Sequence, residues 1–254
     1  MTKAATLIAY HGDPAIKDYY LARVRAHRAA DELVAGVGWE NGKGCAVGCT
    51  LDSYAHSRYP KELGIPQHLA FIQDSIFEAL ARTGEDHLAF PELFLSAIMP
   101  GADLSMVWPR FAYALLSDNE SPVVQAMGES PQVREAVGGV ATLYDEWVGT
   151  GVQPSSELFA SAARAAAAAA MGAAEEAEEA EEAGESEASA ASALAGWAGA
   201  AAARAAEGAA EAEALEEAAA AAGVEEAEAW NWMRDLLLRL LSEAPMIKAE
   251  GENQ

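Results

Sequence analysis

The sequence predicts a mostly α-helical protein: a compact N-terminal helical domain, then long Ala/Glu-rich helices, and finally a C-terminal amphipathic helix. Three observations support this fold class. Apolar residues recur every three or four positions in several segments of the first 150 residues. Alanine, the best helix former, accounts for 35 of the 63 residues from 160 to 222. The strict alternation typical of half-buried strands is weak throughout the chain.

The first predicted helix begins at Asp13-Pro14, because an Asp cap followed by proline is a typical helix start. Six residues then fall on one helical face: Ile16, Tyr20, Val24, His27, Asp31 and Val34. We expect this helix to continue to the glycines at positions 36 and 38. A short helix should follow within residues 46–59 and end at Pro60.

Four further helices are expected over residues 67–82, 90–98, 106–116 and 131–148. In the first of them the inward positions are Leu69, Ile72, Ile76 and Leu80. In the last they are Val133, Val137, Val140, Leu143 and Trp147. We therefore take residues 1–150 as the N-terminal helical domain.

The composition changes abruptly after residue 154. Residues 151–223 are read as a low-complexity arm that is helical or partly disordered, because their glutamates lack lysines at four-residue spacing. Residues 224–245 carry an apolar stripe made of Trp230, Met233, Leu237, Leu240 and Leu241. The apolar stripe of this amphipathic helix needs a surface to pack against. We expect that surface to be either the N-terminal domain or a second copy of the chain in a homo-oligomer.

The charge of the chain argues against several function classes. The formal net charge is −24, with 19 acidic against 11 basic residues in 1–150 and 21 against 5 in 151–254. Such a surface repels phosphates and anionic lipids, so neither nucleic-acid nor membrane binding is expected. With two cysteines, a short N-terminal apolar run and no long uncharged apolar segment, the sequence favours a cytoplasmic protein. No cofactor is expected.

Residues 38–49, GWENGKGCAVGC, contain four glycines and both cysteines. A phosphate-binding P-loop requires a glycine five positions before the Gly42-Lys43 pair and Ser or Thr after it. The chain has Val37 and Gly44 at those positions, and the segment follows a helix rather than a strand. The motif is therefore not a P-loop.

A metal site in this segment is a weak alternative. If residues 45–56 form one helix, Cys45 and His56 lie roughly 16 Å apart along its axis, too far to share one ion. Cys45 and Cys49 together with His27 of the preceding helix remain a candidate ligand set, although it lacks an evident fourth member.

A reactive thiol is a further interpretation. Cys45 should lie at a helix N-terminus, where unpaired N–H groups and nearby Lys43 would lower its pKa. His27 could then act as the base of a thiol-dependent hydrolase or transferase. The simplest alternative is structural: glycines permit a tight turn, and both cysteines pack as small apolar residues. In that case the polar residues around the turn form a binding surface, namely Trp39, Glu40, Asn41, Lys43, His56 and Arg58.

The segment from HG at positions 11–12 through GWENGKGCAVGCTL to HSRYP and ELG resembles an uncharacterised protein family of bacteriophage and bacterial genomes. The similarity is dense over about residues 8–66, looser over residues 90–116 and only compositional in the alanine-rich tail. The resemblance implies an accessory protein of phage or prophage type that binds a protein or a small molecule. By analogy, host takeover or counter-defence would be its setting.

Overall fold

The computed structural model describes residues 7–126, 131–162, 164–166, 168–169, 172 and 226–247. These residues are mostly α-helical, which confirms the predicted fold class. The chain divides into two compact units, and the first combines residues up to Trp108 with those from Leu236 onward. The second unit extends from Pro109 to Asp235. A membrane-crossing helix is not found in the described part of the chain.

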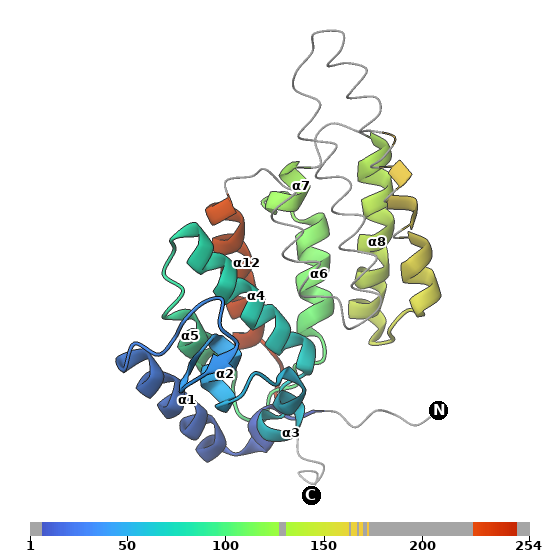
Figure 1. The fold of residues 1–254 in the computed structure, drawn as a ribbon. Coiled ribbons are helices and arrows are strands. Elements are labelled where there is room, and N and C mark those ends of the chain that lie inside the picture. The colour runs from blue at the N-terminus through green and yellow to red at the C-terminus, as the bar shows by residue number, and fades with distance from the viewer. Residues whose placement is uncertain are drawn as a thin grey trace, which may run out of the picture. The chain divides into compact units, whose positions relative to one another are not determined.

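The first unit contains most of the short elements (Figure 1). In chain order they are the 3-10 turn Ala9–Gly12, α1 (Pro14–Ala29), β1 (Trp39–Glu40), β2 (Lys43–Gly44), α2 (Ala46–Leu51), the 3-10 turn His56–Arg58, α3 (Tyr59–Leu63), α4 (Gln67–Thr83) and α5 (Phe90–Ala97). The buried helix α2 packs against both α1 and α4. Through these contacts, α2 links the glycine-rich segment to the core of the unit.

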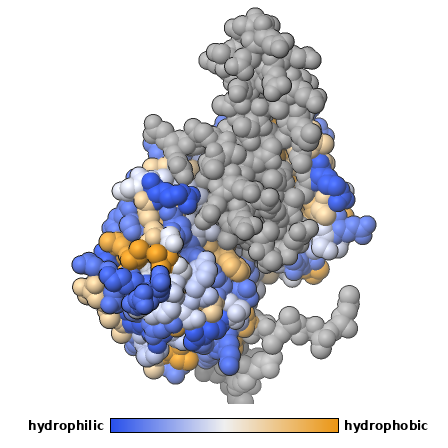
Figure 2. All heavy atoms as spheres, viewed as in Figure 1, coloured by the Kyte–Doolittle hydropathy of each residue, from blue (hydrophilic) through white to orange (hydrophobic). Residues whose placement is uncertain are grey.

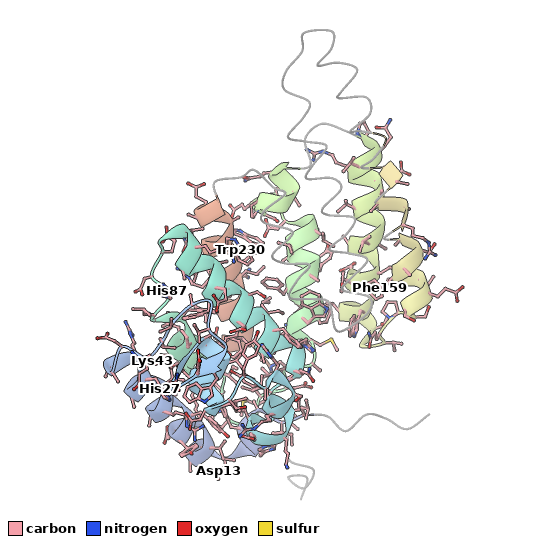
Figure 3. The ribbon with its side chains drawn as sticks, in the orientation of Figure 1. Asp13, His27, Lys43, His87, Phe159 and Trp230 are labelled. Carbon is pink, nitrogen blue, oxygen red and sulfur yellow. The ribbon has the colours of Figure 1, made fainter. Side chains whose placement is uncertain are left out.

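Helix α1 is shorter than its apolar pattern predicts. It starts as expected, with the Asp13 carboxylate accepting the N–H of Ala15, but it ends at Ala29. The chain turns there because Asp31 adopts a left-handed backbone (φ 54°) and Glu32 donates its N–H to the His27 carbonyl. Val34 therefore lies outside the helix, where its N–H bonds to Gly44 O at 2.8 Å. Figure 3 labels Asp13 at the start of α1 and His27 near its end.

The helix expected within residues 46–59 is also shorter in the structure. It ends at Leu51, because Asp52 takes the left-handed conformation at its C-terminus. Pro60 does not end a helix as predicted; instead it lies in the first turn of α3, where proline's missing N–H costs nothing. The strand pair β1–β2 was not expected from the weak strand pattern.

The longer helices agree closely with the periodicity. Leu69, Ile72, Ile76 and Leu80 of α4 are all fully buried, as predicted. Helices α6 (Val107–Ser117) and α8 (Pro131–Thr150) match the expected segments, and a short α7 (Pro122–Ala126) lies between them. In α8, Val133, Val137 and Val140 are buried as predicted, whereas Leu143 and Trp147 are only partly buried and Tyr144 is buried instead.

Helix α12 (Glu226–Ser242) corresponds to the predicted amphipathic helix. All five residues of its apolar stripe are buried within this single chain: Trp230, Met233, Leu237, Leu240 and Leu241. After α12 the backbone pairs with the first unit, where Asp103 N donates to Pro245 O and Ile247 N donates to Gly101 O. Most of the predicted 151–223 arm lies outside the described residues.

Several large apolar side chains of the first unit are exposed. The largest include Tyr19, Tyr54 and Leu93. On the face shown in Figure 2, the apolar patches are small and lie among hydrophilic residues. Isolated exposed apolar residues of this kind are normal for a folded protein.

Candidate functional site

The glycine-rich segment folds tightly against the start of α2. A side-chain Cβ at Gly48 would lie 1.9 Å from the carbonyl oxygen of Gly38, and one at Gly44 would lie 2.4 Å from the same atom. A Cβ at Gly38 would lie 2.6 Å from the Tyr54 ring. Gly44 and Gly48 are therefore required by close backbone packing, and Gly38 leaves room for the Tyr54 ring.

The fourth, Gly42, belongs to the turn between β1 and β2. Asn41 and Gly42 both have positive φ angles, of 51° and 82°, which is the combination that a two-residue hairpin turn requires. Glu40, Asn41 and Lys43 are exposed on this turn, whereas the Trp39 ring meets the His27 ring edge-on at 5.5 Å between centroids. The hairpin thus presents three of the predicted binding residues to solvent.

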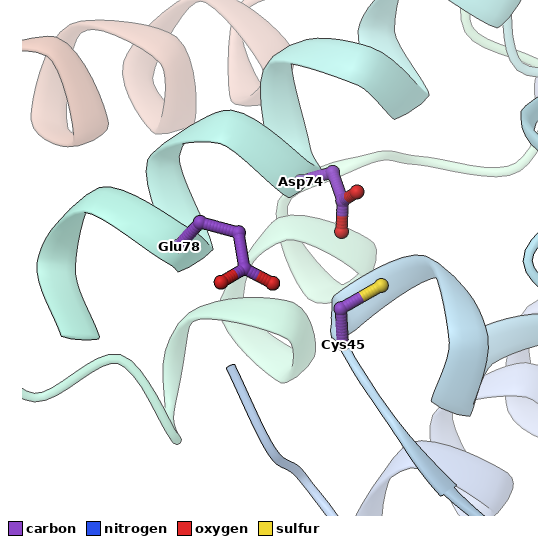
Figure 4. A group of neighbouring side chains, drawn as sticks. All are labelled: Cys45, Asp74 and Glu78. Atoms are coloured by element: carbon purple, nitrogen blue, oxygen red, sulfur yellow. The ribbon is translucent and has the colours of Figure 1, made fainter. Parts of the chain in front are cut away.

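Cys45 caps α2 and lies beneath the turn. Its backbone N–H donates to Val37 O at 2.7 Å, and its sulfur accepts the N–H of Gly48 at 3.4 Å. The side chain is buried. Its neighbours across the packing interface are Asp74 and Glu78, one turn apart on α4, and the three ligand-type atoms lie within 4.8 Å of one another. Figure 4 shows both carboxylates facing the Cys45 sulfur.

Asp74 is the least satisfied member of this group. The residue is only 7% exposed, and the Cys45 thiol and the Tyr54 hydroxyl lie close enough to act as donors to its carboxylate, yet its Oδ1 has no partner in hydrogen-bond geometry among the residues that the structure describes. Its Oδ2 lies 3.3 Å from Nε2 of His56, which is itself buried and without hydrogen-bond geometry to any described group. Leaving a buried polar atom unpaired costs about 1–3 kcal/mol, so the unpaired Oδ1 of Asp74 is unusual.

Glu78 and Tyr54 form the outer edge of the cluster. The Glu78 carboxylate accepts the backbone N–H of Gly36 at 2.6 Å, which ties the loop before β1 to α4. Glu78 is half-buried, and Tyr54 is 55% exposed. The cluster therefore lies at the boundary of the core, within reach of solvent. We refer to Cys45, Asp74 and Glu78 as the thiol–carboxylate cluster.

The surroundings of the cluster favour the protonated forms of the Cys45 thiol and the Tyr54 phenol. Burial raises the pKa of the Cys45 thiol, and the adjacent Asp74 carboxylate raises it further. Burial and the same acidic neighbours also raise the pKa of the Tyr54 phenol. The shift at Cys45 is opposite to the lowered pKa that its helix-terminal position predicts, because desolvation outweighs the hydrogen bonds from the Gly48 and Val47 backbone.

His27 and Cys49 are engaged elsewhere. The two ring nitrogens of His27 lie 2.7 Å from a Glu32 carboxylate oxygen and 3.1 Å from an Asp52 carboxylate oxygen. The Cys49 thiol donates to the Gly44 carbonyl at 3.3 Å. Within the described residues, the ligand atoms of His27, Cys45 and Cys49 do not form a group that could hold a metal ion. The structure thus places a carboxylate, rather than the His27 imidazole, beside Cys45.

His56 and Arg58 lie in different surroundings, although both were expected on one binding surface. The His56 ring is buried and stacks on Phe71 at 4.2 Å between centroids. Arg58 forms an ion pair with Glu62, one helical turn further along, and donates to the Leu51 carbonyl. His56 therefore belongs to the neighbourhood of Asp74, whereas Arg58 helps to hold α3 against the end of α2.

The sequence analysis missed Asp74 and Glu78. A usable pattern was present, because two acidic residues stand at i and i+4 in α4, where like charges repel and weaken a helix. Asp74 lies within a stretch of α4 that is buried throughout from Ile72 to Phe77. A buried carboxylate with a second acidic group one turn away indicates that a neighbouring group offsets the charge.

We predict that Cys45 reacts slowly with iodoacetamide near neutral pH. Its raised pKa keeps the thiol protonated, and burial hides it, so alkylation should be about tenfold or more slower than for free cysteine. The measurement uses a Cys49→Ser background, so that one thiol is followed by mass spectrometry. His27→Gln should leave the rate unchanged. A rate equal to that of free cysteine, or one that falls in His27→Gln, would contradict this arrangement.

Comparisons of the chain with protein-family models, with curated proteins and with solved structures found no match.

Proposed function

We propose that this chain acts by binding, as an accessory protein of phage or prophage type, and that its ligand occupies the thiol–carboxylate cluster. The observation that carries this proposal is the unpaired Oδ1 of Asp74, in a residue only 7% exposed. Asp74 faces a buried thiol and a second carboxylate, so a bound group would satisfy polar atoms that otherwise remain unpaired. The resemblance of residues 8–66 to a phage-borne family supports the accessory role, with host takeover or counter-defence as its setting.

The surroundings of the cluster also suit binding. The exposed hairpin residues Glu40, Asn41 and Lys43 lie between Cys45 and the loop at positions 37–38, whose carbonyls accept the Cys45 N–H. Tyr54, which packs on Gly38, and half-buried Glu78 lie at the solvent side. A thiol-dependent enzyme that uses Cys45 and His27 has less support, because His27 is held by Glu32 and Asp52.

Native mass spectrometry of the purified full-length chain tests the proposal. We expect the folded protein to exceed its sequence mass by one bound group, which is released on denaturation. Asp74→Ala should be isolated at its sequence mass, whereas Asp52→Asn, which changes an acidic residue of the His27 network, should retain the group. If the wild-type protein and both variants all show the sequence mass, the proposal is contradicted.

A further inference from the structure

We infer that the ligand of the thiol–carboxylate cluster is a divalent transition-metal ion of the zinc class, held by Cys45, Asp74 and Glu78. This inference rests on the proposed binding function and names the chemistry of its ligand. It depends on three features of the cluster: its donor atoms, their spacing and the unpaired atoms beside it.

The donor atoms select the class of ion. One thiolate and two carboxylates form a mixed soft and hard set, which suits zinc and its neighbours among the transition metals. Magnesium and calcium take oxygen ligands almost exclusively, so a cysteine in the set disfavours them. On binding, the Cys45 thiol loses its proton to solvent, and the ion accepts the sulfur lone pair. The thiolate and the two carboxylates, each negatively charged, then surround an ion of charge +2.

The spacing suits a single ion. In a tetrahedral zinc site, bond lengths of about 2.0–2.3 Å place neighbouring ligand atoms roughly 3.3–3.8 Å apart. The three ligand atoms in this structure lie within 4.8 Å of one another. Side-chain rotations that shift these atoms by about 1 Å would therefore bring all three within bonding distance of one ion. Asp74 and Glu78 project from adjacent turns of one helix toward Cys45 (Figure 4). Three protein ligands leave a fourth position for water.

The unpaired atoms supply independent support. Oδ1 of buried Asp74 has no partner in hydrogen-bond geometry among the described residues, which is the state expected of a carboxylate whose partner is an ion. Nε2 of buried His56 lies 3.3 Å from the other oxygen of Asp74. Carboxylates that bind metal ions are usually supported by such a neighbour, so we assign His56 as a positioning residue for Asp74.

Cobalt titration of the reduced, chelator-treated full-length chain tests the inference. We expect one equivalent of Co²⁺ to produce a sulfur-to-cobalt charge-transfer band that Zn²⁺ abolishes. Cys45→Ser should lose the band, and Asp74→Asn should weaken Zn²⁺ binding on the order of 100-fold or more. Cys49→Ser is the matched control, because it alters the other buried thiol, which bonds to the Gly44 carbonyl, and it should keep the band.

Circular dichroism of each variant confirms that it is folded before its titration is interpreted. The inference is overturned if the wild-type chain shows no such band, if Cys45→Ser retains it, or if only Mg²⁺ binds. The native mass spectrum separates this failure from failure of the proposed function. An organic group bound in place of a metal ion would uphold binding at the cluster and contradict the metal, whereas the bare sequence mass together with no cobalt band would contradict both.

Discussion

Gly48→Ala is expected to lower the free energy of unfolding of the first unit by about 3 kcal/mol or more. The added Cβ would lie 1.9 Å from the Gly38 carbonyl oxygen, a backbone atom that cannot rotate away. To relieve this clash, the segment that contains Gly38 must move away from α2. That movement breaks the hydrogen bonds from Cys45 N to the carbonyls of Val37 and Gly38. Because whole domains are stable by only about 5–15 kcal/mol, this loss is a large share of the total.

Urea unfolding followed by circular dichroism measures the effect. Gly139→Ala is the matched control, because that glycine is exposed in α8 with nothing within 4 Å of its added Cβ. There alanine should stabilise the helix by about 0.5–1 kcal/mol. If Gly48→Ala is as stable as the wild type, residues 38–48 do not pack as described, and the position of Cys45 is in doubt.

Asp74→Asn is expected to separate stability from binding. Without added metal, the variant should be within about 1 kcal/mol of the wild type or more stable, since it replaces a buried carboxyl that has an unpaired oxygen. With Zn²⁺ at one hundred times its dissociation constant, the wild-type protein should gain about 2.7 kcal/mol, because the ion binds the folded state. The variant should gain little at the same concentration.

Thermal and urea unfolding with and without Zn²⁺ give both quantities. Glu62→Gln is a suitable control, because Glu62 pairs with Arg58 and lies outside the cluster, so its Zn²⁺ response should match that of the wild type. If metal-free Asp74→Asn loses about 3 kcal/mol or more of its free energy of unfolding, Asp74 stabilises the fold through its contacts with His56 or Tyr54. That result, with an unchanged Zn²⁺ response, would contradict the assignment of Asp74 as a ligand.

Helices with a long apolar stripe could be predicted from the sequence. The helical period predicts the extent of α4 and four of its buried positions, although the structure also buries polar residues of α4 outside that stripe. The end of α1 could not be predicted in the same way. Asp31 adopts a positive φ angle just after the helix, Glu32 and Val34 then form backbone hydrogen bonds with Gly44, and the apolar pattern continues past the true end at Ala29.

The hairpin was not predicted, although Asn-Gly is a strong two-residue turn signal, because strands of only two residues leave no alternating pattern. The site was predictable only in part. The motif identifies Cys45 as its centre, because glycines and a helix start surround it. Its partners come from α4, a separate helix, and no local pattern states which face of α4 meets α2. For the same reason, the sequence suggests His27 as a partner of Cys45, whereas in the structure His27 contacts Glu32 and Asp52 instead.

The most direct test of the metal assignment is an anomalous diffraction map, recorded at the zinc absorption edge from crystals of the full-length chain grown with Zn²⁺. We predict a peak bounded by the Cys45 sulfur and the carboxylates of Asp74 and Glu78, at bond lengths of about 2.0–2.3 Å. A map with no peak there, or with zinc held only by other residues, would contradict the account.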